Sequence, residues 1–204
     1  MRAVIITGGR MADYDYIRQF IRPDDCIIAA DSGYRHAERL GLRPRVLLGD
    51  FDSIGALPRG IETLRVPERK DFTDTEFAVE WARGQGMRDF LLLGAIGTRM
   101  DHTLTNILLL DRLLTAGEVG QVIDEHNRIW ITDAAAEIDG APGEILSLVP
   151  LTVCAGVTTH NLEYPLLDAT LQVGYGWGVS NVIRKSPAQV TLTSGKMLVM
   201  LCRD

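Results

Sequence analysis

Short apolar runs alternate with segments of helical periodicity along the first two-thirds of the chain, and this alternation strongly limits the possible folds. Buried strands are predicted at residues 3–9, 26–31, 46–50, 61–66 and 90–94. Helices are predicted between them, at residues 13–21, 33–41, 74–83 and 101–116. Apolar strands that alternate with helices are typical of a parallel sheet covered on both faces. The expected fold class is therefore α/β, with a mostly parallel sheet and flanking helices.

The pattern changes after residue 134, where we find no helical period. Short β-prone runs separated by Gly, Pro, Asn and Ser occupy residues 144–149, 153–159, 169–173, 189–193 and 197–202. This spacing predicts an antiparallel β-sandwich or barrel. We therefore expect two domains, an α/β domain over 1–133 and a β-sandwich domain over 134–204. A β-domain of about 70 residues is marginally stable alone, so it should pack on the first domain or on another subunit.

Composition excludes several classes of protein. The 204 residues include 21 basic and 27 acidic side chains, a formal net charge of −6, which argues against a nucleic-acid partner. No apolar run reaches the roughly 18 residues of a membrane span, and no secretory signal is recognisable. The three cysteines lie far apart without zinc-ligand spacing and are interpreted as buried thiols, so a cytoplasmic location is expected.

Aspartates gather where the predicted strands end. Asp31 ends the second strand, Asp50 ends the third with Asp52 two residues later, and Asp101 follows the strand at 90–94. Ligands of open parallel sheets bind outside the carboxyl ends of the strands, so these acids should converge on one edge. Carboxylates that lie so close repel one another unless cations join them. Mg²⁺, which prefers carboxylate ligands and substrate phosphate, is the expected ion.

Asp50 and Asp52 form the sharpest pair within this group. In an extended segment, residues i and i+2 point the same way, so both carboxylates can reach one ion. The structural alternative is a turn in which aspartate caps local backbone amides. The position at a strand end, before Ser53, gives the metal and the turn about equal weight, and both interpretations stay open.

The segment over residues 70–76 has two interpretations of equal weight. Thr73 followed by Glu76 is a capping box, and Asp74 in the first turn suits the helix dipole. Capping leaves two residues of the segment without an explanation, Lys70 and Asp71. A helix N-terminus beside them could also receive phosphate.

A third group of polar residues opens the helix at 101–116. His102 and Asn106 are four residues apart and therefore share one helical face. Arg99 precedes the helix, where a guanidinium suits charge on a transferring phosphoryl group. Asp101 as an N-cap and His102 as a packed polar residue are the structural alternatives.

Several common nucleotide and nucleophile motifs are missing from the sequence. There is no GxxxxGK[ST], no GxGxxG after a strand and no GxSxG. The glycine-rich stretch at 174–178 lies in the β-rich part and is expected to shape a turn.

In combination, these segments resemble the thiamine pyrophosphokinase family. The resemblance is carried by Ala30–Gly33, Gly49–Ile54, Lys70–Asp74, Arg99–His102 with Asn106, Leu162–Leu166 and Gly178–Asn181. Their order and spacing fit the family over nearly the whole chain. The chain departs from the family pattern at Ser32, Arg45, Phe77 and Val182, of which Phe77 replaces a lysine found in many members.

The resemblance implies an α/β catalytic domain, a C-terminal β-sandwich that helps bind thiamine, and a homodimer with active sites at the subunit interface. It also implies transfer of the pyrophosphoryl group of ATP to the thiamine hydroxyl, giving thiamine diphosphate and AMP. The same aspartates also fit a Mg²⁺-dependent nucleotide phosphohydrolase, which is the alternative function. A non-catalytic thiamine or nucleotide sensor fits less well, because it needs no dense carboxylate cluster.

The resemblance also assigns roles by position. The expected Mg²⁺ ligands are Asp50, Asp52 and Asp74. The expected catalytic residues are Asp71, Asp74, Arg99 and Asp101. The expected nucleotide-binding residues are Asp31, Lys70, Thr73, Arg99, His102 and Asn106. The expected thiamine-binding residues are Ser180, Asn181 and Trp177, where the Trp177 ring would stack on the cationic thiazolium unless it fills the sandwich core.

Overall fold

The computed structural model describes residues 1–51, 59–65 and 71–203. The chain divides into two compact units, Met1–Glu125 and His126–Asp204. The expected division after residue 133 would place β7 (Asn127–Thr132) in the first unit. The structure differs there because β7 pairs along its whole length with β14 (Met197–Cys202) of the second unit.

The first unit contains a parallel sheet. Its strands are β1 (Ala3–Ile6), β2 (Cys26–Ala30), β3 (Val46–Gly49), β4 (Glu62–Arg65), β5 (Asp89–Leu93) and β6 (Val119–Ile123). They lie in the order β6-β5-β1-β2-β3-β4, and each neighbouring pair is parallel. The chain runs outward from β1 to β4 and then returns to β5 on the other side of β1. The strand order therefore reverses between β1 and β5, which is where open α/β sheets bind ligands.

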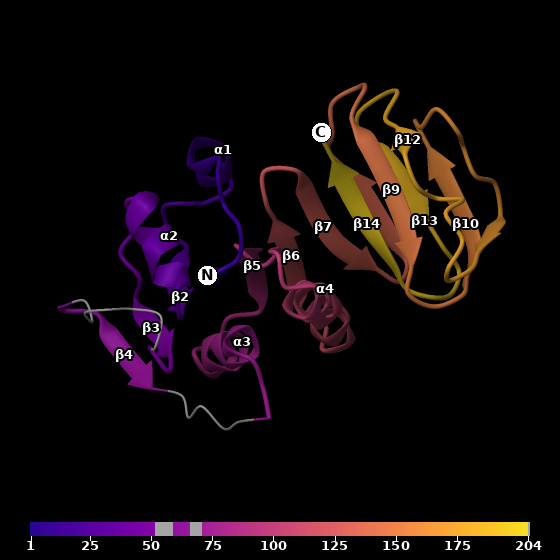
Figure 1. Cartoon of the computed structure of the whole chain (residues 1–204). Helices are drawn as coiled ribbons and strands as arrows, with labels where there is room; N and C mark the ends of the chain where they lie inside the picture. The colour runs from indigo at the N-terminus through magenta and orange to yellow at the C-terminus, as the bar shows by residue number, and fades with distance from the viewer. Residues whose placement is uncertain (52–58, 66–70, 204) are drawn as a thin grey trace. The chain divides into compact units, whose positions relative to one another are not determined.

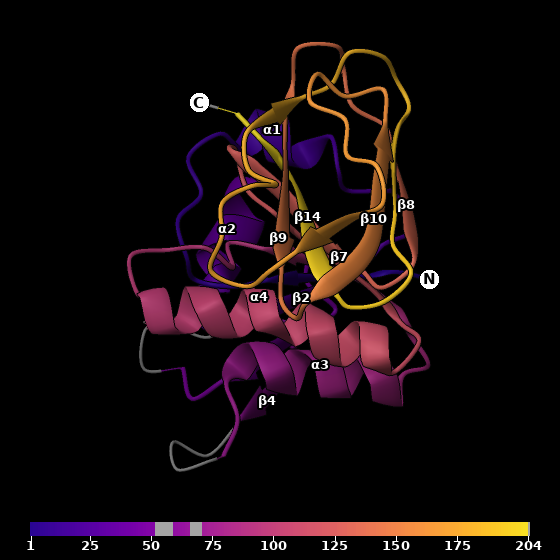
Figure 2. The same ribbon diagram turned by 90° about the vertical axis from the view of Figure 1, so that its right-hand side faces the viewer.

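Helices cover both faces of this sheet, as predicted. They are α1 (Tyr14–Arg18), α2 (Gly33–Arg39), α3 (Asp74–Gly84) and α4 (Met100–Thr115). Figures 1 and 2 show α1 and α2 together on one face and α3 and α4 together on the other. Val4 and Ile6 of β1 belong to the core that includes Ile17 and Ala37 from α1 and α2. Ile5 between them is also fully buried, which explains why the strand is apolar at every position.

Helix boundaries follow local capping signals. The predicted capping box is confirmed at α3: Glu76 N donates to Thr73 Oγ1 at 3.2 Å, and Thr73 N donates to Glu76 Oε2 at 2.8 Å. The N-cap of α4 is Arg99, so the interpretation of Asp101 as an N-cap is wrong, and Asp101 lies in the first turn. In the part of the chain that the structure describes, no helix has the length and apolar character needed to cross a bilayer.

The second unit is built from two antiparallel sheets. One has the order β12-β9-β14-β7 and the other β11-β10-β13-β8. The strands not yet given are β8 (Ala135–Ile138), β9 (Ile145–Pro150), β10 (Cys154–His160), β11 (Ala169–Leu171), β12 (Asn181–Val182) and β13 (Ala188–Thr191). Leu148 and Val199 from the first sheet share one core with Val157 and Val190 from the second. The unit is a β-sandwich, as predicted.

All five β-prone runs predicted for the last third are strands, but four strands were not predicted. These are β6, β7, β8 and β12. The first three follow one another after α4 and carry partly exposed polar residues such as Gln121 and Arg128, which weaken the apolar signal. Asn181–Val182 is too short for a pattern and becomes a strand only through its pairing with β9.

Candidate active site

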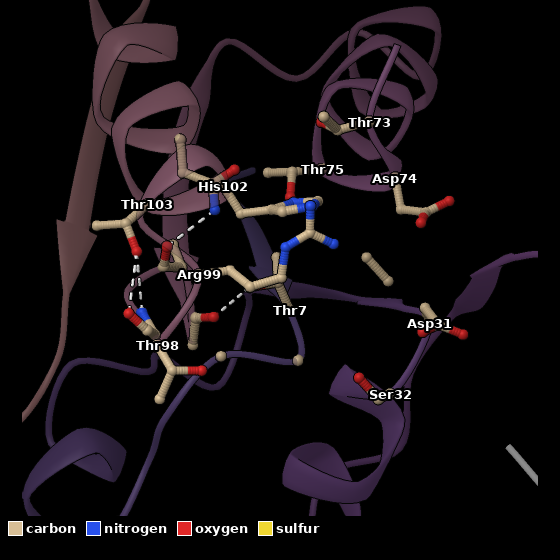
Figure 3. A pocket seen from close by; sticks show the side chains of 17 residues that line it. Thr7, Asp31, Ser32, Thr73, Asp74, Thr75, Thr98, Arg99, His102 and Thr103 are labelled. Atoms are coloured by element: carbon tan, nitrogen blue, oxygen red, sulfur yellow. Dashed lines mark hydrogen bonds between the residues drawn. The ribbon is translucent and has the colours of Figure 1, made fainter. Parts of the chain in front are cut away.

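A cavity of about 320 Å³ lies at the carboxyl edge of the parallel sheet (Figure 3). It is formed by the ends of β1, β2 and β5 and by the first turns of α3 and α4. Its lining consists of Thr7, Gly8, Gly9, Ala30, Asp31, Ser32, Thr73, Asp74, Thr75, Gly94, Ala95, Gly97, Thr98, Arg99, His102, Thr103 and Asn106. Of the strand-end acids that were expected to converge on one edge, Asp31 lines this cavity.

The end of β1 is tied directly to the end of β5. The buried Thr7 hydroxyl donates to the Gly94 carbonyl, 87 residues away in sequence. Gly9 N donates to the same carbonyl at 2.7 Å, and Arg10 N donates to Ile96 O at 2.8 Å. A Cβ at Gly9 would collide with the carbonyls of Gly94 and Ile96, so the turn needs glycine there. These bonds hold the cavity wall across the point where the strand order reverses.

Two helix N-termini face the cavity. Thr73, Asp74 and Thr75 line it from the start of α3, and Arg99 and His102 line it from the start of α4. The free amides of a helix N-terminus favour bound anions, phosphate above all. Capping and cavity lining coexist at Thr73, because its hydroxyl caps the helix while the residue faces the cavity. Phe77, one turn further on, stacks against Phe72 with ring centroids 5.6 Å apart.

Arg99 is held by Asp101. Arg99 Nη2 donates to Asp101 Oδ2 at 2.6 Å, and Nε donates to Oδ1 at 3.2 Å. His102 N also donates to Asp101 Oδ1, at 2.9 Å. The Arg99 bonds and this amide lower the pKa of Asp101 from 3.8 to about 2. Asp101 is exposed and absent from the cavity lining, and its low pKa makes it a poor proton acceptor.

His102 and Asn106 both line the cavity from α4, in agreement with the shared helical face that their spacing predicted. His102 is exposed, whereas Asn106 is buried and its Nδ2 donates to Ala95 O at 2.8 Å. Thr103, which the sequence did not single out, bonds both backbone groups of Gly97: Gly97 N donates to its hydroxyl at 3.1 Å, and the hydroxyl contacts Gly97 O at 3.3 Å. Asn106 and Thr103 thus fasten the loop between β5 and α4.

Carboxylates gather on the side of the cavity formed by β2 and α3. Figure 3 shows Asp31 and Asp74 on this side. Asp50 directly follows β3, which pairs with β2, and Asp31 N donates to Leu48 O at 2.7 Å. A Cβ at Gly49 would lie 3.2 Å from Asp31 Cα, so the two strand ends approach closely. These carboxylates thus come from three elements at the same edge, and carboxylate oxygen is the ligand type that Mg²⁺ prefers.

Other predicted residues do not line this cavity. Asp71 is exposed outside the lining, and Asp50 also lies outside it. Asp52 and Lys70 lie outside the described residues. Within residues 1–51, 59–65 and 71–203, no three His, Cys, Asp or Glu side chains come together as a group that could hold a metal ion. Of the three expected Mg²⁺ ligands, the structure describes Asp50 and Asp74.

The second unit has its own cavity, of about 280 Å³, beside the glycine-rich turn. Trp177 lines it and is 64% exposed, so the interpretation of Trp177 as a core residue is wrong. Asn181 also lines it, but its side chain bonds the backbone: Nδ2 donates to Tyr164 O at 2.7 Å, and Tyr164 N donates to Oδ1 at 3.0 Å. Ser180 lies outside the lining, with a positive φ of 60°.

Sequence reasoning missed the contribution of β1 to the first cavity. The glycine pair at the end of β1 was visible as a strand terminator, but its place beside β5 was not. Applying the carboxyl-edge rule to every strand, including β1, would have indicated the residues concerned: Thr7, Gly8 and Gly9.

The fold and the cavity together indicate a class of enzyme. A doubly covered parallel sheet, with a cavity at its switch point lined by aspartates, an arginine and two helix N-termini, is typical of enzymes that handle nucleotide phosphates.

Comparison with known proteins narrows this class. The family described as "Thiamin pyrophosphokinase, catalytic domain" matches residues 17–118, and the family described as "Thiamin pyrophosphokinase, vitamin B1 binding domain" matches residues 135–197. The chain belongs to the thiamin pyrophosphokinase family.

Individual relatives agree with this assignment. The thiamine pyrophosphokinase of Bacillus subtilis is 26% identical over 187 residues, which cover 87% of each chain. A crystal structure of the enzyme from that organism superposes with a TM-score of 0.90 at 22% identity, covering all of both chains. The structure from Geobacillus thermodenitrificans gives a TM-score of 0.85 at 25% identity, covering all of this chain and 98% of the other.

Proposed function

We propose that this protein transfers the pyrophosphoryl group of ATP to the hydroxyl of thiamine, giving thiamine diphosphate and AMP. The observation that carries the proposal is the cavity at the switch point, where Asp31 and Asp74, Arg99 and two helix N-termini face one space. The membership of the chain in the thiamin pyrophosphokinase family supplies the substrates.

The residues around the cavity suit an in-line transfer. A primary alcohol is a weak nucleophile, and phosphoryl transfer depends mainly on alignment and charge neutralisation. Arg99, oriented by Asp101, would stabilise charge on the moving group. Between the two carboxylates considered as proton acceptor, Asp71 is the better candidate, since the low pKa of Asp101 makes it a weak base.

We propose Asp50, Asp52 and Asp74 as the residues that would hold Mg²⁺. The ion would supply positive charge to the phosphates of ATP. The presence of Asp74 in the cavity and of Asp50 at the adjacent strand end supports this assignment. The proposed nucleotide-binding residues are Asp31, Lys70, Thr73, Arg99, His102 and Asn106. Of these, Asn106 would act through the loop that its amide fastens.

We propose that the cavity of the second unit contributes to thiamine binding. The exposed Trp177 ring can stack on a cationic thiazolium. Asn181 would act by holding Tyr164 and the adjacent loop in place. Ser180 remains a proposed contact through its position beside this cavity.

Trp177→Ala is expected to raise the KM for thiamine about tenfold, because stacking of a cation on an indole is worth roughly 1–2 kcal/mol. The KM for ATP should change less than twofold. Steady-state rates with each substrate varied in turn give both values. Tyr175→Ala, an exposed aromatic of the same turn outside the cavity lining, is the matched control. An unchanged thiamine KM in Trp177→Ala would contradict the stacking role.

A homodimer with active sites at the subunit interface is also proposed. Three exposed apolar residues spaced by four, Met100, Leu104 and Leu108, form one stripe on α4 beside the cavity-facing residues. Sedimentation equilibrium of the full chain should give twice the monomer mass. We further propose a cytoplasmic location, which suits the buried thiols of Cys26 and Cys154.

One assay tests the proposed function. The protein is incubated with ATP and Mg²⁺, with and without thiamine, and AMP is measured. AMP that appears only with thiamine, in equal amount with thiamine diphosphate, is the expected result. AMP or ADP formed at the same rate without thiamine would indicate the phosphohydrolase instead. Binding of ATP without turnover in either reaction would contradict both enzymatic functions.

A further inference from the structure

His36 lies behind the cavity wall and contacts the β1–α1 turn. Its ring Nε2 lies 2.9 Å from the Gly9 carbonyl oxygen, and its Nδ1 lies 2.7 Å from the Tyr14 hydroxyl. Arg39 Nη1 donates to the same hydroxyl at 3.1 Å. The chain of contacts therefore runs from Arg39 through Tyr14 and His36 to a residue of the cavity lining.

Donor and acceptor chemistry determines which atom donates and which accepts at each hydrogen bond in this chain of contacts. A carbonyl only accepts, so His36 Nε2 carries the proton and donates to Gly9. The neutral ring then has a lone pair on Nδ1, which accepts from the Tyr14 hydroxyl, while the hydroxyl oxygen accepts from Arg39. Burial lowers the pKa of His36, and the Arg39 charge adds to this against the opposing effects of the Gly9 carbonyl and Glu125. The neutral form with this single tautomer is therefore favoured.

The peptide between Gly9 and Arg10 is bonded at both of its polar groups. Its carbonyl accepts from His36, and its N–H donates to Ile96 O at 2.8 Å. One side of the peptide is thus held by α2 and the other by the loop that leads to Arg99. Two bonds in opposite directions fix the plane of the peptide, and with it the turn that lines the cavity.

We propose that His36 is a positioning residue for binding of the ATP phosphates, acting through the Gly9 carbonyl, with Tyr14 and Arg39 selecting its tautomer. The inference rests on the proposed function, because it takes the cavity to be the nucleotide site. His36 itself does not line the cavity and touches no substrate.

The test compares two replacements of the ring. His36→Phe keeps an aromatic ring but removes the bond, leaving the Gly9 carbonyl without this donor. The dissociation constant of ATP with Mg²⁺, measured by calorimetry without thiamine, is expected to rise about tenfold. His36→Gln can place an amide N–H near Gly9 and should stay within about threefold of wild type. In kinetics, the KM for ATP should rise while the KM for thiamine is unchanged.

Controls distinguish a specific effect on ATP binding from a general effect on folding. His160→Phe, at an exposed histidine in the second unit, should leave the ATP dissociation constant unchanged. If His36→Phe fails to fold, Tyr14→Phe removes only the hydroxyl that selects the tautomer and should weaken ATP binding about two- to threefold. Long-range ¹⁵N–¹H correlation of wild type should show the Nε2–H tautomer.

Defined results would overturn the inference. These are an unchanged ATP dissociation constant in folded His36→Phe, a Gln variant as weak as the Phe variant, an unchanged constant in Tyr14→Phe, or an Nδ1–H tautomer in wild type. Failure of the proposed function looks different, because wild type would then not bind ATP, or would bind it and not transfer pyrophosphate to thiamine.

Discussion

Asp74→Asn is expected to lower kcat for AMP formation by about 10²- to 10³-fold, the range seen when one electrostatic contact to a transition state is removed. Asn has nearly the same size and keeps one carboxyl-like oxygen, so the change removes charge more than shape. Asp74 opens α3 and lines the cavity, where the proposed Mg²⁺ needs that charge. Asp50→Asn, at the residue that follows β3, should have a similar effect.

Folding should be little affected by Asp74→Asn. Removing one negative charge from the first turn of a helix reduces the free energy of unfolding by about 0.3–1 kcal/mol. Asp89→Asn is the matched control, because Asp89 begins β5 at the opposite edge of the sheet. The Mg²⁺ concentration for half-maximal rate should rise in the Asp74 and Asp50 variants only. Near-normal rates in both of those variants would remove the basis for the metal assignment.

Arg99→Ala is the second change with a large expected effect, a fall in kcat of about 10²- to 10³-fold. The guanidinium is placed to neutralise charge that develops on the transferred group, and such arginines contribute strongly to phosphoryl transfer. Arg99→Lys should recover only part of the rate, since an ammonium lacks the planar two-donor geometry. Arg88→Ala, at the residue just before β5, serves as the control and should keep full activity.

A substitution at Asp101 tests whether this residue acts by holding Arg99 or as the general base. If Asp101 acts by holding Arg99, Asp101→Asn should lower kcat by about tenfold, and the double variant should be no slower than Arg99→Ala. If Asp101 were the general base, the two effects would multiply.

The pH dependence of this ion pair follows from the low pKa of Asp101. Because that pKa is about 2, below the ordinary 3.8, the carboxylate is fully ionised above about pH 4 and loses its charge only as the pH falls through about 2. The Arg99–Asp101 pair is therefore intact over the whole neutral range. Asp101 cannot produce an acidic limb in the rate profile between pH 5 and 9, and any such limb belongs to another group.

Much of the fold could be predicted from local patterns. Uninterrupted apolar runs separated by helical segments require a sheet buried on both faces, and β1, β2, β3 and β5 follow this rule. The capping box at Thr73 and Glu76 was visible in the sequence because its two bonds join residues only three apart. Strands with mixed polarity, such as β6 and β7, were missed because their burial depends on their neighbours.

The site was only partly predictable. Asp31, Thr73, Asp74, Arg99, His102 and Asn106 were expected there, and all of them line the cavity. Asp71 and Asp101 do not, since a position in sequence near a helix start leaves the direction of the side chain open. The pairing of Arg99 with Asp101 depends on side-chain rotamers, which a motif does not encode.

By itself, the sequence determined that an α/β part is followed by an antiparallel β part. It also determined the helix that begins at Asp74 and the concentration of aspartates at strand ends. These are local properties, set by periodicity and by residues within one turn of each other. Only the tertiary structure decided that β1 lies beside β5, which brings Thr7 and Gly9 to Gly94 and closes the cavity. Strand order depends on which distant surfaces bury each other, and no local pattern contains that information.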